Sequence, residues 1–431
     1  MSFRSTIKKL IPTSLFAKVE PYGHLLEAIF YNVIYDFPAK NIKVIGVTGT
    51  SGKTSTSFLI ERMLHEAGFK VGLMTTVGYG IGRDIKPQTN TMTTVSVPEL
   101  MKRLKWMKSQ GVEWLVLETT SHALAQNRVW GIPYYLAVFT NLTHEHLDYH
   151  KTFENYRNAK RKLFKLVNKN TNGTQTGIIN IEDPSAKYFA GDVKKPILYG
   201  VDKGDLQASK VVLRPSGSDF EAKIEGDTYK IHTNLPGSFN VSNSLAAIGV
   251  GRVLGLSVIQ VEKGIAALES VEGRMTRIDA GQAFDVIVDF AHTPDSFEKI
   301  FKDIKPMVKG KLLVVFGSPG RRDETKRAIQ GELAGKYCDE VIITEDDPRD
   351  IDPIEIMNQI ASGSEKVGKI RDKDLFLIND RTEAINFAIK RAQYDDTVLL
   401  LGKGHEKVIH RAHGDDTWNE VEVAKKAIGP S

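Results

Sequence analysis

Residues 46–54 read Gly-Val-Thr-Gly-Thr-Ser-Gly-Lys-Thr, and the fold of the chain follows from this stretch. It comes after the β-branched run Ile42–Val47 and before a segment that carries Leu59, Met63 and Ala67 on one helical face. Glycines between a strand and a helix let backbone N–H groups turn inward, and the helix N-terminus adds positive potential. This pattern predicts a phosphate-binding loop in an α/β domain.

The loop departs from the strict Walker pattern, which needs a glycine where this chain has Val47. The match is to a variant, T-G-T-x-G-K-T, in which Lys53 would reach the β- and γ-phosphates and Thr54 would meet Mg²⁺. An ordinary glycine turn with an exposed lysine is the alternative, and the position between strand and helix argues against it. The residues expected at the nucleotide here are Gly49, Thr50, Ser51, Gly52, Lys53, Thr54 and Ser55.

Composition restricts the class of protein. The 431 residues, 41% hydrophobic and 26% charged, indicate a globular chain of more than one domain. No run approaches the roughly 20 apolar residues that span a bilayer, and His24–Tyr35 is better interpreted as an amphipathic or core helix. A secretory signal is not expected, and the single cysteine, Cys338, fits a reducing cytoplasm. The net charge of +5 is spread along the chain, which argues against nucleic-acid binding.

Short apolar runs alternate with helical segments in two blocks, which predicts two mostly parallel sheets covered by helices. The predicted strands are Ile42–Val47, Val71–Val77, Trp114–Leu117, Leu136–Thr140, Gly177–Ile181, Asp285–Asp289, Lys311–Phe316, Glu340–Thr344, Leu375–Ile378 and Thr397–Leu401. Between the blocks, Gly226-Asp227 is the expected hairpin turn, and Val241–Leu254 is an expected helix. We therefore expect a short N-terminal segment (1–40), a central P-loop ATPase-like domain (41–272) and a C-terminal Rossmann-like domain (273–431).

Motifs along nearly the whole chain, taken in order, resemble those of the Mur ligase family, and within it the UDP-N-acetylmuramoyl-tripeptide synthetases. The resembling segments are Thr48–Thr54, Met92–Thr94, Glu118–Arg128, Phe139–Leu142, His146–His150, Ala159-Lys160, Gly237–Asn243, Gly273–Met275, Val288–Pro294, Arg322-Asp323, Lys326-Arg327, Asp346–Arg349 and Gly402–Glu406. Each motif alone is weak, but their order along the chain is specific.

The resemblance implies an ATP-dependent ligase that activates a carboxylate as an acyl phosphate and joins it to an amine. Its substrates would be UDP-N-acetylmuramoyl-L-alanyl-D-glutamate and either meso-diaminopimelate or lysine, with ATP and two Mg²⁺ ions. Full-length relatives have a longer segment before the loop that binds the uridine end, which leaves uridine recognition here in question. Folylpolyglutamate synthase shares the loop variant and is the nearest alternative, and an idle nucleotide-binding protein is another. The sequence identifies no protein partner.

Glu118 ends the apolar run Trp114–Leu117, so its carboxylate should emerge at the carboxyl edge of a sheet, where a hard oxygen ligand suits Mg²⁺. A capping or salt-bridged glutamate is the alternative. The resemblance places His146 at a magnesium ion, whereas its neighbours His122, His144 and His150 leave zinc as the alternative.

Lys160, judged by its residue type, is a solvated helix lysine. The resemblance implies instead that it is carbamylated and that its carbamate helps to place a second Mg²⁺.

The remaining site residues are assigned through the resemblance. Asn240 and Asn243 would lie near the adenine, although helix capping is the alternative for Asn240, and Asp289 would accept ribose hydroxyls with His292 nearby. Residues expected at the nucleotide-sugar peptide are Thr93, Thr94, Thr120, Gln126 and Arg128. Those expected at the incoming amino acid are Arg322, Asp347, Arg349, Gly402 and Glu406.

The choice of amino acid depends on the segment Asp346-Asp347-Pro348-Arg349. In the family, the matching arginine clamps the distal carboxylate of diaminopimelate, and a guanidinium is well suited to that bidentate contact. Asp347 stands where the family has asparagine, and its extra carboxylate would favour a cation. We expect diaminopimelate rather than lysine.

Overall fold

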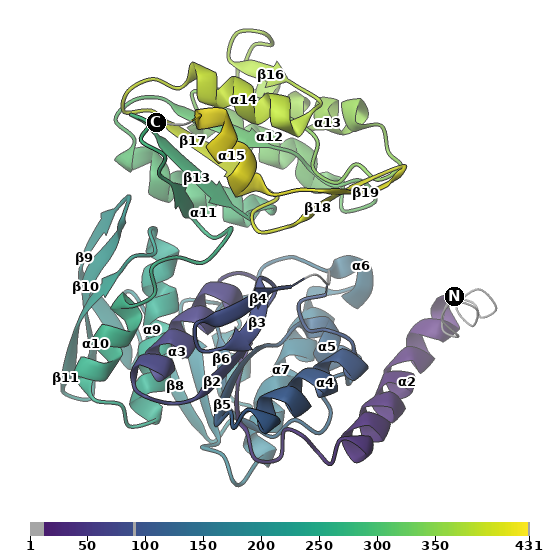
Figure 1. The fold of residues 1–431 in the computed structure, drawn as a ribbon, viewed down its shortest axis with the longest axis vertical. Helices are drawn as coiled ribbons and strands as arrows, with labels where there is room; N and C mark the ends of the chain where they lie inside the picture. Colours follow the sequence, from purple (N-terminus) through teal and green to yellow (C-terminus); the bar gives the residue numbers. More distant parts are fainter. Residues whose placement is uncertain (1–12, 89–91, 430–431) are drawn as a thin grey trace. The chain divides into compact units, whose positions relative to one another are not determined.

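The computed structural model describes residues 13–88 and 92–429, with side chains from Val19 onward except that of Asp148. The chain divides into two compact units (Figure 1). The first consists of residues 1–211, 219–232 and 240–268, and the second of residues 212–218, 233–239 and 269–431. The predicted α/β class is confirmed in both units. The domain limits proposed from the sequence, at 40/41 and 272/273, stay predictions.

The first unit is built on a sheet in the order β11-β10-β9-β8-β7-β6-β1-β5-β2-β3-β4. From β2 to β9 all neighbouring strands are parallel, whereas β3 and β4 are antiparallel additions at one edge. The strands are β1 (Lys43–Thr48), β2 (Val71–Met74), β3 (Gly78–Ile81), β4 (Asp84–Pro87), β5 (Trp114–Glu118), β6 (Tyr134–Phe139), β7 (Thr176–Asn180), β8 (Lys195–Gly200), β9 (Leu206–Arg214), β10 (Gly217–Ile224) and β11 (Asp227–Thr233).

The helices of this unit bury apolar side chains against the sheet. A core cluster joins α4, α7 and α8 to β1, β5, β6 and β7, while α3 packs against α10 outside that cluster. The helices are α2 (Thr13–Ile34), α3 (Lys53–Glu66), α4 (Val97–Ser109), α5 (Ser121–Ala125), α6 (Leu147–His150), α7 (Phe153–Lys169), α8 (Ala186–Ala190), α9 (Ser238–Val253) and α10 (Val258–Ala266). Among the helices of the described residues, none has the length and hydropathy needed to cross a membrane.

The hairpin between β10 and β11 turns one residue earlier than predicted. Its turn is Glu225-Gly226, not Gly226-Asp227, and Asp227 is the first residue of β11. Both turn residues have positive φ, 47° for Glu225 and 88° for Gly226. A two-residue hairpin of the I′ type requires positive φ at both turn residues. Gly226 adopts such a φ without strain, whereas Glu225 carries a side chain at the other position.

The second unit has a sheet in the order β12-β13-β17-β14-β15-β16, parallel except for β12. Its strands are β12 (Thr276–Ile278), β13 (Asp285–Asp289), β14 (Leu312–Phe316), β15 (Glu340–Ile343), β16 (Leu375–Leu377), β17 (Thr397–Leu401) and the separate hairpin β18 (Val408–Arg411) and β19 (Gly414–Thr417). One core cluster involves α11, α12 and α13, and a second involves α14 and α15. These helices are α11 (Pro294–Ile304), α12 (Thr325–Tyr337), α13 (Pro353–Lys366), α14 (Arg381–Arg391) and α15 (Glu420–Ile428).

A buried ion pair fixes α15 beside the carboxyl end of the second sheet. Arg381 and Glu420 are both fully buried, with Arg381 Nη2 2.6 Å from Glu420 Oε1. The same guanidinium donates to the carbonyls of Glu345 and Leu401, where β15 and β17 end. Trp418 Nε1 donates to the other Glu420 oxygen at 2.7 Å. The Arg381 charge thus holds the Glu420 carboxylate and the two carbonyl groups directly, and it holds the Trp418 ring through Glu420.

Replacing Arg381 by methionine should therefore strand Glu420 as a buried, unpaired carboxylate. We expect the free energy of unfolding of the second unit to fall by about 3–5 kcal/mol, measured by urea denaturation. Arg371→Met is the matched control, because Arg371 pairs with Glu365 at the surface and should cost less than about 1 kcal/mol. Equal losses in the two variants would contradict the importance given to the buried pair.

Candidate functional site

The loop between β1 and α3 needs glycine at two positions. Gly49 and Gly52 have φ values of 154° and 79°. A Cβ on Gly49 would lie 1.9 Å from Thr140 Oγ1, and one on Gly52 would lie 2.5 Å from Asn243 Oδ1. A side chain at either position would therefore collide with the residues that pack against the loop, and both φ values are ones that glycine adopts without strain.

Two residues that follow β6 hold this loop. Asn141 Oδ1 accepts from Ser51 N at 2.9 Å, and Asn141 Nδ2 donates to Ser51 O at 3.0 Å. Thr140 Oγ1 donates to the same carbonyl at 2.7 Å. Thr140 and Asn141 belong to the resembling segment Phe139–Leu142 but are not among the predicted site residues. Their position is informative, since β6 and β1 are neighbours and their carboxyl ends meet at one edge.

Oxygen ligands converge at the start of α3. Thr54 Oγ1 donates to Glu118 Oε2 at 3.0 Å, and Lys53 Nζ lies 4.0 Å from Glu118 Oε1. Thr76, which sequence reasoning missed, donates to Glu118 through its N–H and its hydroxyl, both at 3.1 Å. A hydroxyl and a carboxylate at a phosphate loop are hard oxygen donors, so Thr54 and Glu118 fit Mg²⁺.

Lys160 is buried, so its interpretation as a solvated helix lysine is wrong. It is 2% exposed, and its Nζ donates to Gly49 O at 2.6 Å. Burial, reinforced by the positive charge of Lys53, moves the pKa of Lys160 well below its ordinary value. The sequence held the signal, because residue 160 shares a helical face with the buried Tyr156, Leu163 and Val167.

His146 lies among other aromatic rings. Its ring centroid is 4.7 Å from that of His122 and 6.0 Å from that of Tyr156, and its Nε2 is 3.7 Å from Glu145 Oε2. The zinc alternative finds no support in residues 13–88 and 92–429, where the one group of three convergent ligand atoms involves no histidine. His150 Nε2 is hydrogen-bonded to Ser121 Oγ at 3.0 Å.

Asn240 and Asn243 lie inside α9, which begins at Ser238, so the capping interpretation of Asn240 is wrong. Asn243 Nδ2 donates to Asn240 Oδ1 at 2.8 Å. Thr56 Oγ1 donates to Asn243 Oδ1 at 3.2 Å, which joins α9 to the helix of the phosphate loop. The two amides are thus next to the loop residues of the same unit.

The residues expected at the nucleotide-sugar peptide gather around the backbone of Glu118. Thr94 Oγ1 donates to Glu118 O at 3.0 Å and accepts from Thr120 N at 3.1 Å. Thr93 Oγ1 lies within hydrogen-bond distance of Thr76 Oγ1, at 2.9 Å. These hydroxyls occupy the same sheet edge as the loop.

Arg128 forms hydrogen bonds to the backbone of the segment that contains Thr94. Its guanidinium donates to Thr94 O and Val95 O, and its Nε donates to Gln126 Oε1 at 2.9 Å. Burial lowers the pKa of Arg128 to about 10. Gln126 in turn donates to Glu20 of α2 at 3.3 Å. Arg128 therefore positions the Thr93-Thr94 segment.

In the second unit, Asp289 is the last residue of β13, and its carboxylate accepts hydrogen bonds from backbone N–H groups. Its oxygens accept from Met275 N at 2.8 Å and Ala291 N at 2.7 Å, and burial raises its pKa. His292 Nδ1 is 3.0 Å from Phe290 O. Both residues lie at the carboxyl edge of the sheet, and their roles toward ribose stay predictions.

A buried lysine gathers three carboxylates at the ends of β15 and β17. Lys403 Nζ is 2.8 Å from Asp347 Oδ1, 3.6 Å from Asp346 Oδ1 and 2.7 Å from Glu406 Oε2. Burial alone would lower the pKa of Lys403, but the three carboxylates outweigh it and raise that pKa.

The Asp347 carboxylate is thus paired with Lys403, and it also accepts from His410 N at 3.0 Å. Three carboxylates around one ammonium leave the cluster formally negative, so the effect of Asp347 on the choice of substrate stays a prediction. Gly402, also expected at the amino acid, directly precedes this lysine at the end of β17.

Arg349 and Arg322, also expected at the incoming amino acid, are not paired with the Lys403 carboxylates. Arg349 has φ 58°, and its N–H donates to His410 O at 2.9 Å, which fixes the loop after Asp347 against β18. Arg322 is exposed. Neither guanidinium forms an ion pair with a described residue, although the charge of Arg349, after the hydrogen bond from Arg321, helps to lower the pKa of Asp350.

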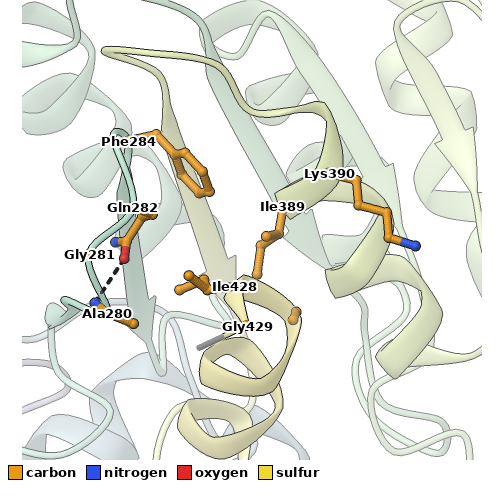
Figure 2. Close-up of a pocket in the computed structure, with 9 residues that line it drawn as sticks. Ala280, Gly281, Gln282, Phe284, Ile389, Lys390, Ile428 and Gly429 are labelled. Carbon is orange, nitrogen blue, oxygen red and sulfur yellow. Dashed lines mark hydrogen bonds between the residues drawn. The ribbon is translucent and has the colours of Figure 1, made fainter. Parts of the chain in front are cut away.

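A shallow pocket of about 280 Å³ lies elsewhere in the second unit. Figure 2 shows it between the loop before β13, the end of α14 and the end of α15, with the Lys390 ammonium pointing away. It is at the amino end of β13, opposite Asp289. None of the residues expected at the site lines it, so we do not assign it to the reaction.

Two family models match the chain. One, described as the Mur ligase middle domain, matches residues 47–251, and the other, described as the Mur ligase glutamate ligase domain, matches residues 273–404. The 2,6-diaminopimelate ligase of Geobacillus thermodenitrificans is 40% identical over 95% of this chain and 83% of its own length. The UDP-N-acetylmuramyl-tripeptide synthetase of Borreliella afzelii is 39% identical over 97% and 83%.

Solved structures resemble the chain as well. A UDP-N-acetylmuramoyl-L-alanyl-D-glutamate–2,6-diaminopimelate ligase matches with a TM-score of 0.65 and 29% identity, covering 95% of this chain and 82% of the other. Folylpolyglutamate synthase of Mycobacterium tuberculosis matches with a TM-score of 0.73 over 94% and 96%, but at 15% identity this likeness concerns the fold alone.

Lys53 offers the most direct test of the loop assignment. Lys53→Ala should reduce ATP turnover by about 10²-fold or more, because a charge aimed at the transferring phosphate is lost. The unfolding midpoint should stay unchanged. Lys165→Ala, an exposed lysine of α7, is the control and should keep full turnover. Near-normal turnover in Lys53→Ala would refute the loop assignment.

Proposed function

The chain belongs to the Mur ligase family, and we propose that it adds meso-diaminopimelate to UDP-N-acetylmuramoyl-L-alanyl-D-glutamate. The observation that carries the proposal is the 40% identity to a 2,6-diaminopimelate ligase over 95% of this chain. The chain is an ATP-dependent ligase of peptidoglycan synthesis. A single buried cysteine, Cys338, fits the cytoplasmic location expected from the sequence.

The reaction has two chemical steps. The substrate carboxylate attacks the γ-phosphate of ATP and forms an acyl phosphate, and the amine then displaces phosphate through a tetrahedral intermediate. Such phosphoryl transfer needs positioning and charge neutralisation more than covalent help. Lys53 and the N–H groups of residues 49–52 would supply these to the phosphates. Mg²⁺, held by Thr54 and Glu118, would supply further neutralisation.

The environment of Lys160 supports carbamylation. Burial and the Lys53 charge lower the pKa of Lys160, which favours the neutral amine more than in an exposed lysine. The neutral amine adds to CO₂ and loses one proton, which leaves an anionic carbamate. That anion would lie near the Lys53 charge and would give a metal an oxygen ligand, with His146 as the further ligand that we propose.

The second unit supports the choice of diaminopimelate. Neither Arg349 nor Arg322 forms an ion pair with a described residue, whereas Asp347 is paired with Lys403. A guanidinium without an ion-pair partner can grip the distal carboxylate of diaminopimelate bidentately.

Folylpolyglutamate synthesis is the alternative on this fold. We would detect it by ADP release with a folate and glutamate. Our proposal expects ADP release only when UDP-muramoyl-dipeptide and diaminopimelate are both present. Release with the folate pair, or release that ignores the dipeptide, would overturn the proposal.

Lys160→Ala should lose activity and recover part of it with short carboxylic acids, which replace the missing carbamate. Lys165→Ala should keep activity and ignore the acids. A crystal structure with magnesium and an ATP analogue should show extra density on Lys160 Nζ. An unmodified amine in that structure would contradict carbamylation.

Arg349→Ala should lower kcat/KM for diaminopimelate far more than for lysine, because only diaminopimelate has the distal carboxylate. Loss of a charge-assisted bidentate contact costs about 2–5 kcal/mol at a desolvated site. Arg371→Ala, at the surface of the same unit, should change neither value. Equal losses for both amino acids would mean that Arg349 holds the loop and does not select the substrate.

A further inference from the structure

The hairpin formed by β18 and β19, labelled in Figure 1, is separate from the six-stranded sheet of the second unit. Its first strand nevertheless supports the loop that follows β15. Arg349 N donates to His410 O at 2.9 Å, and His410 N donates to Asp347 Oδ1 at 3.0 Å. Arg349 and Arg411 also form an isolated parallel bridge. The loop expected to take the incoming amino acid therefore depends on β18 for its position.

Arg411, the last residue of β18, binds a buried carboxylate just after β15. Its Nε donates to Glu345 Oε2 at 3.0 Å, and its Nη2 donates to the other oxygen of that carboxylate. Its Nη1 donates to Asp416 of β19. The Glu345 side chain is 5% exposed and precedes Asp347 by two residues. A guanidinium that binds one carboxylate through two nitrogens fixes direction as well as distance, so Arg411 ties both strands of the hairpin to the base of the loop.

The backbone of Arg349 needs this support. Its φ of 58° is in the left-handed region, where a residue with a Cβ stays only if its surroundings hold it there. Neighbouring residues have other anchors, since Gly320 N donates to Asp347 O at 2.8 Å and Arg321 pairs with Asp350 at the surface. The described hydrogen bond of the Arg349 N–H goes to β18. Because the backbone angles of residue 349 set the direction in which its side chain leaves the loop, releasing β18 would redirect the guanidinium.

We propose that Arg411 is a positioning residue for the incoming amino acid and acts through β18 on the backbone of Arg349. The inference rests on the proposed function, in which Arg349 binds the distal carboxylate of diaminopimelate. The Arg411 guanidinium is itself bonded to Glu345 and Asp416, so it acts through another residue. Its loss would leave the Arg349 charge in place and remove the fixed direction of that charge. The effect should therefore appear in the KM for diaminopimelate, with kcat at saturating diaminopimelate close to the wild-type value.

The chain offers a matched control at the opposite end of β15. Arg391 binds Glu340, the first residue of that strand, through Nε at 2.6 Å and Nη2 at 3.1 Å. The Glu340 side chain is 7% exposed, so the two ion pairs are alike in geometry and burial. Arg411→Met should raise the KM for diaminopimelate roughly tenfold, because misplacing a binding group by about 1 Å can cost up to about 10²-fold. Arg391→Met should keep the wild-type KM, and equal KM values in the two variants would overturn the proposal.

A double-mutant cycle separates positioning from a separate effect of Arg411. If Arg411 acts through Arg349, Arg411→Met should add little to the rise in KM that Arg349→Ala already causes. Effects that multiply would contradict the proposal.

Stability is separated by a second variant. Glu345→Gln added to Arg411→Met removes the unpaired buried carboxylate, so the urea midpoint should recover while the KM for diaminopimelate stays raised. Recovery of the KM as well would mean that Arg411 acts only on stability. A wild-type protein that does not use diaminopimelate would overturn the proposed function and this inference with it. A wild type that uses it, with Arg411→Met unaffected, would overturn this inference alone.

Discussion

The hydrogen bond from Lys160 Nζ to Gly49 O joins α7 to the phosphate loop inside the protein. A buried ammonium is costly unless it is paired, and here the nearby Lys53 charge opposes it further. Both effects move the pKa of Lys160 below its ordinary value, directly beside the loop. The glycines at 49 and 52, the Glu118–Thr54 contact and the asparagines of α9 are all arranged around this loop.

In the second unit, the surroundings of a buried lysine shift its pKa in the opposite direction. Lys403 has three carboxylates within 3.6 Å, and they raise its pKa. It remains an ammonium and ties the ends of β15 and β17 together. Arg349, two residues beyond Asp347, forms no ion pair with a described residue. The two buried lysines thus have pKa values shifted in opposite directions, because burial and a like charge dominate at Lys160 and three carboxylates dominate at Lys403.

The sequence predicted the α/β class and most of the strands, because buried parallel strands are continuous apolar runs followed by glycine or polar residues. It misjudged features that depend on neighbours from distant parts of the chain. Residue type alone makes Lys160 a solvated lysine, and only its position on the buried stripe of α7 indicates that it is buried. The pairing of Asp347 with Lys403 is not visible in the sequence, because the two residues are 56 positions apart. The hairpin turn was misplaced by one residue, since Gly226 fits either position of such a turn.

Transfer of oxygen-18 from the substrate carboxylate to phosphate tests the central claim most directly. UDP-muramoyl-dipeptide labelled with ¹⁸O in the D-glutamate carboxylate that is joined would be turned over with ATP and diaminopimelate. An acyl phosphate keeps one carboxylate oxygen bonded to phosphorus when the amine displaces it, so the account predicts one ¹⁸O in each released phosphate. Phosphate that carries no ¹⁸O, while the tripeptide product accumulates, would contradict it.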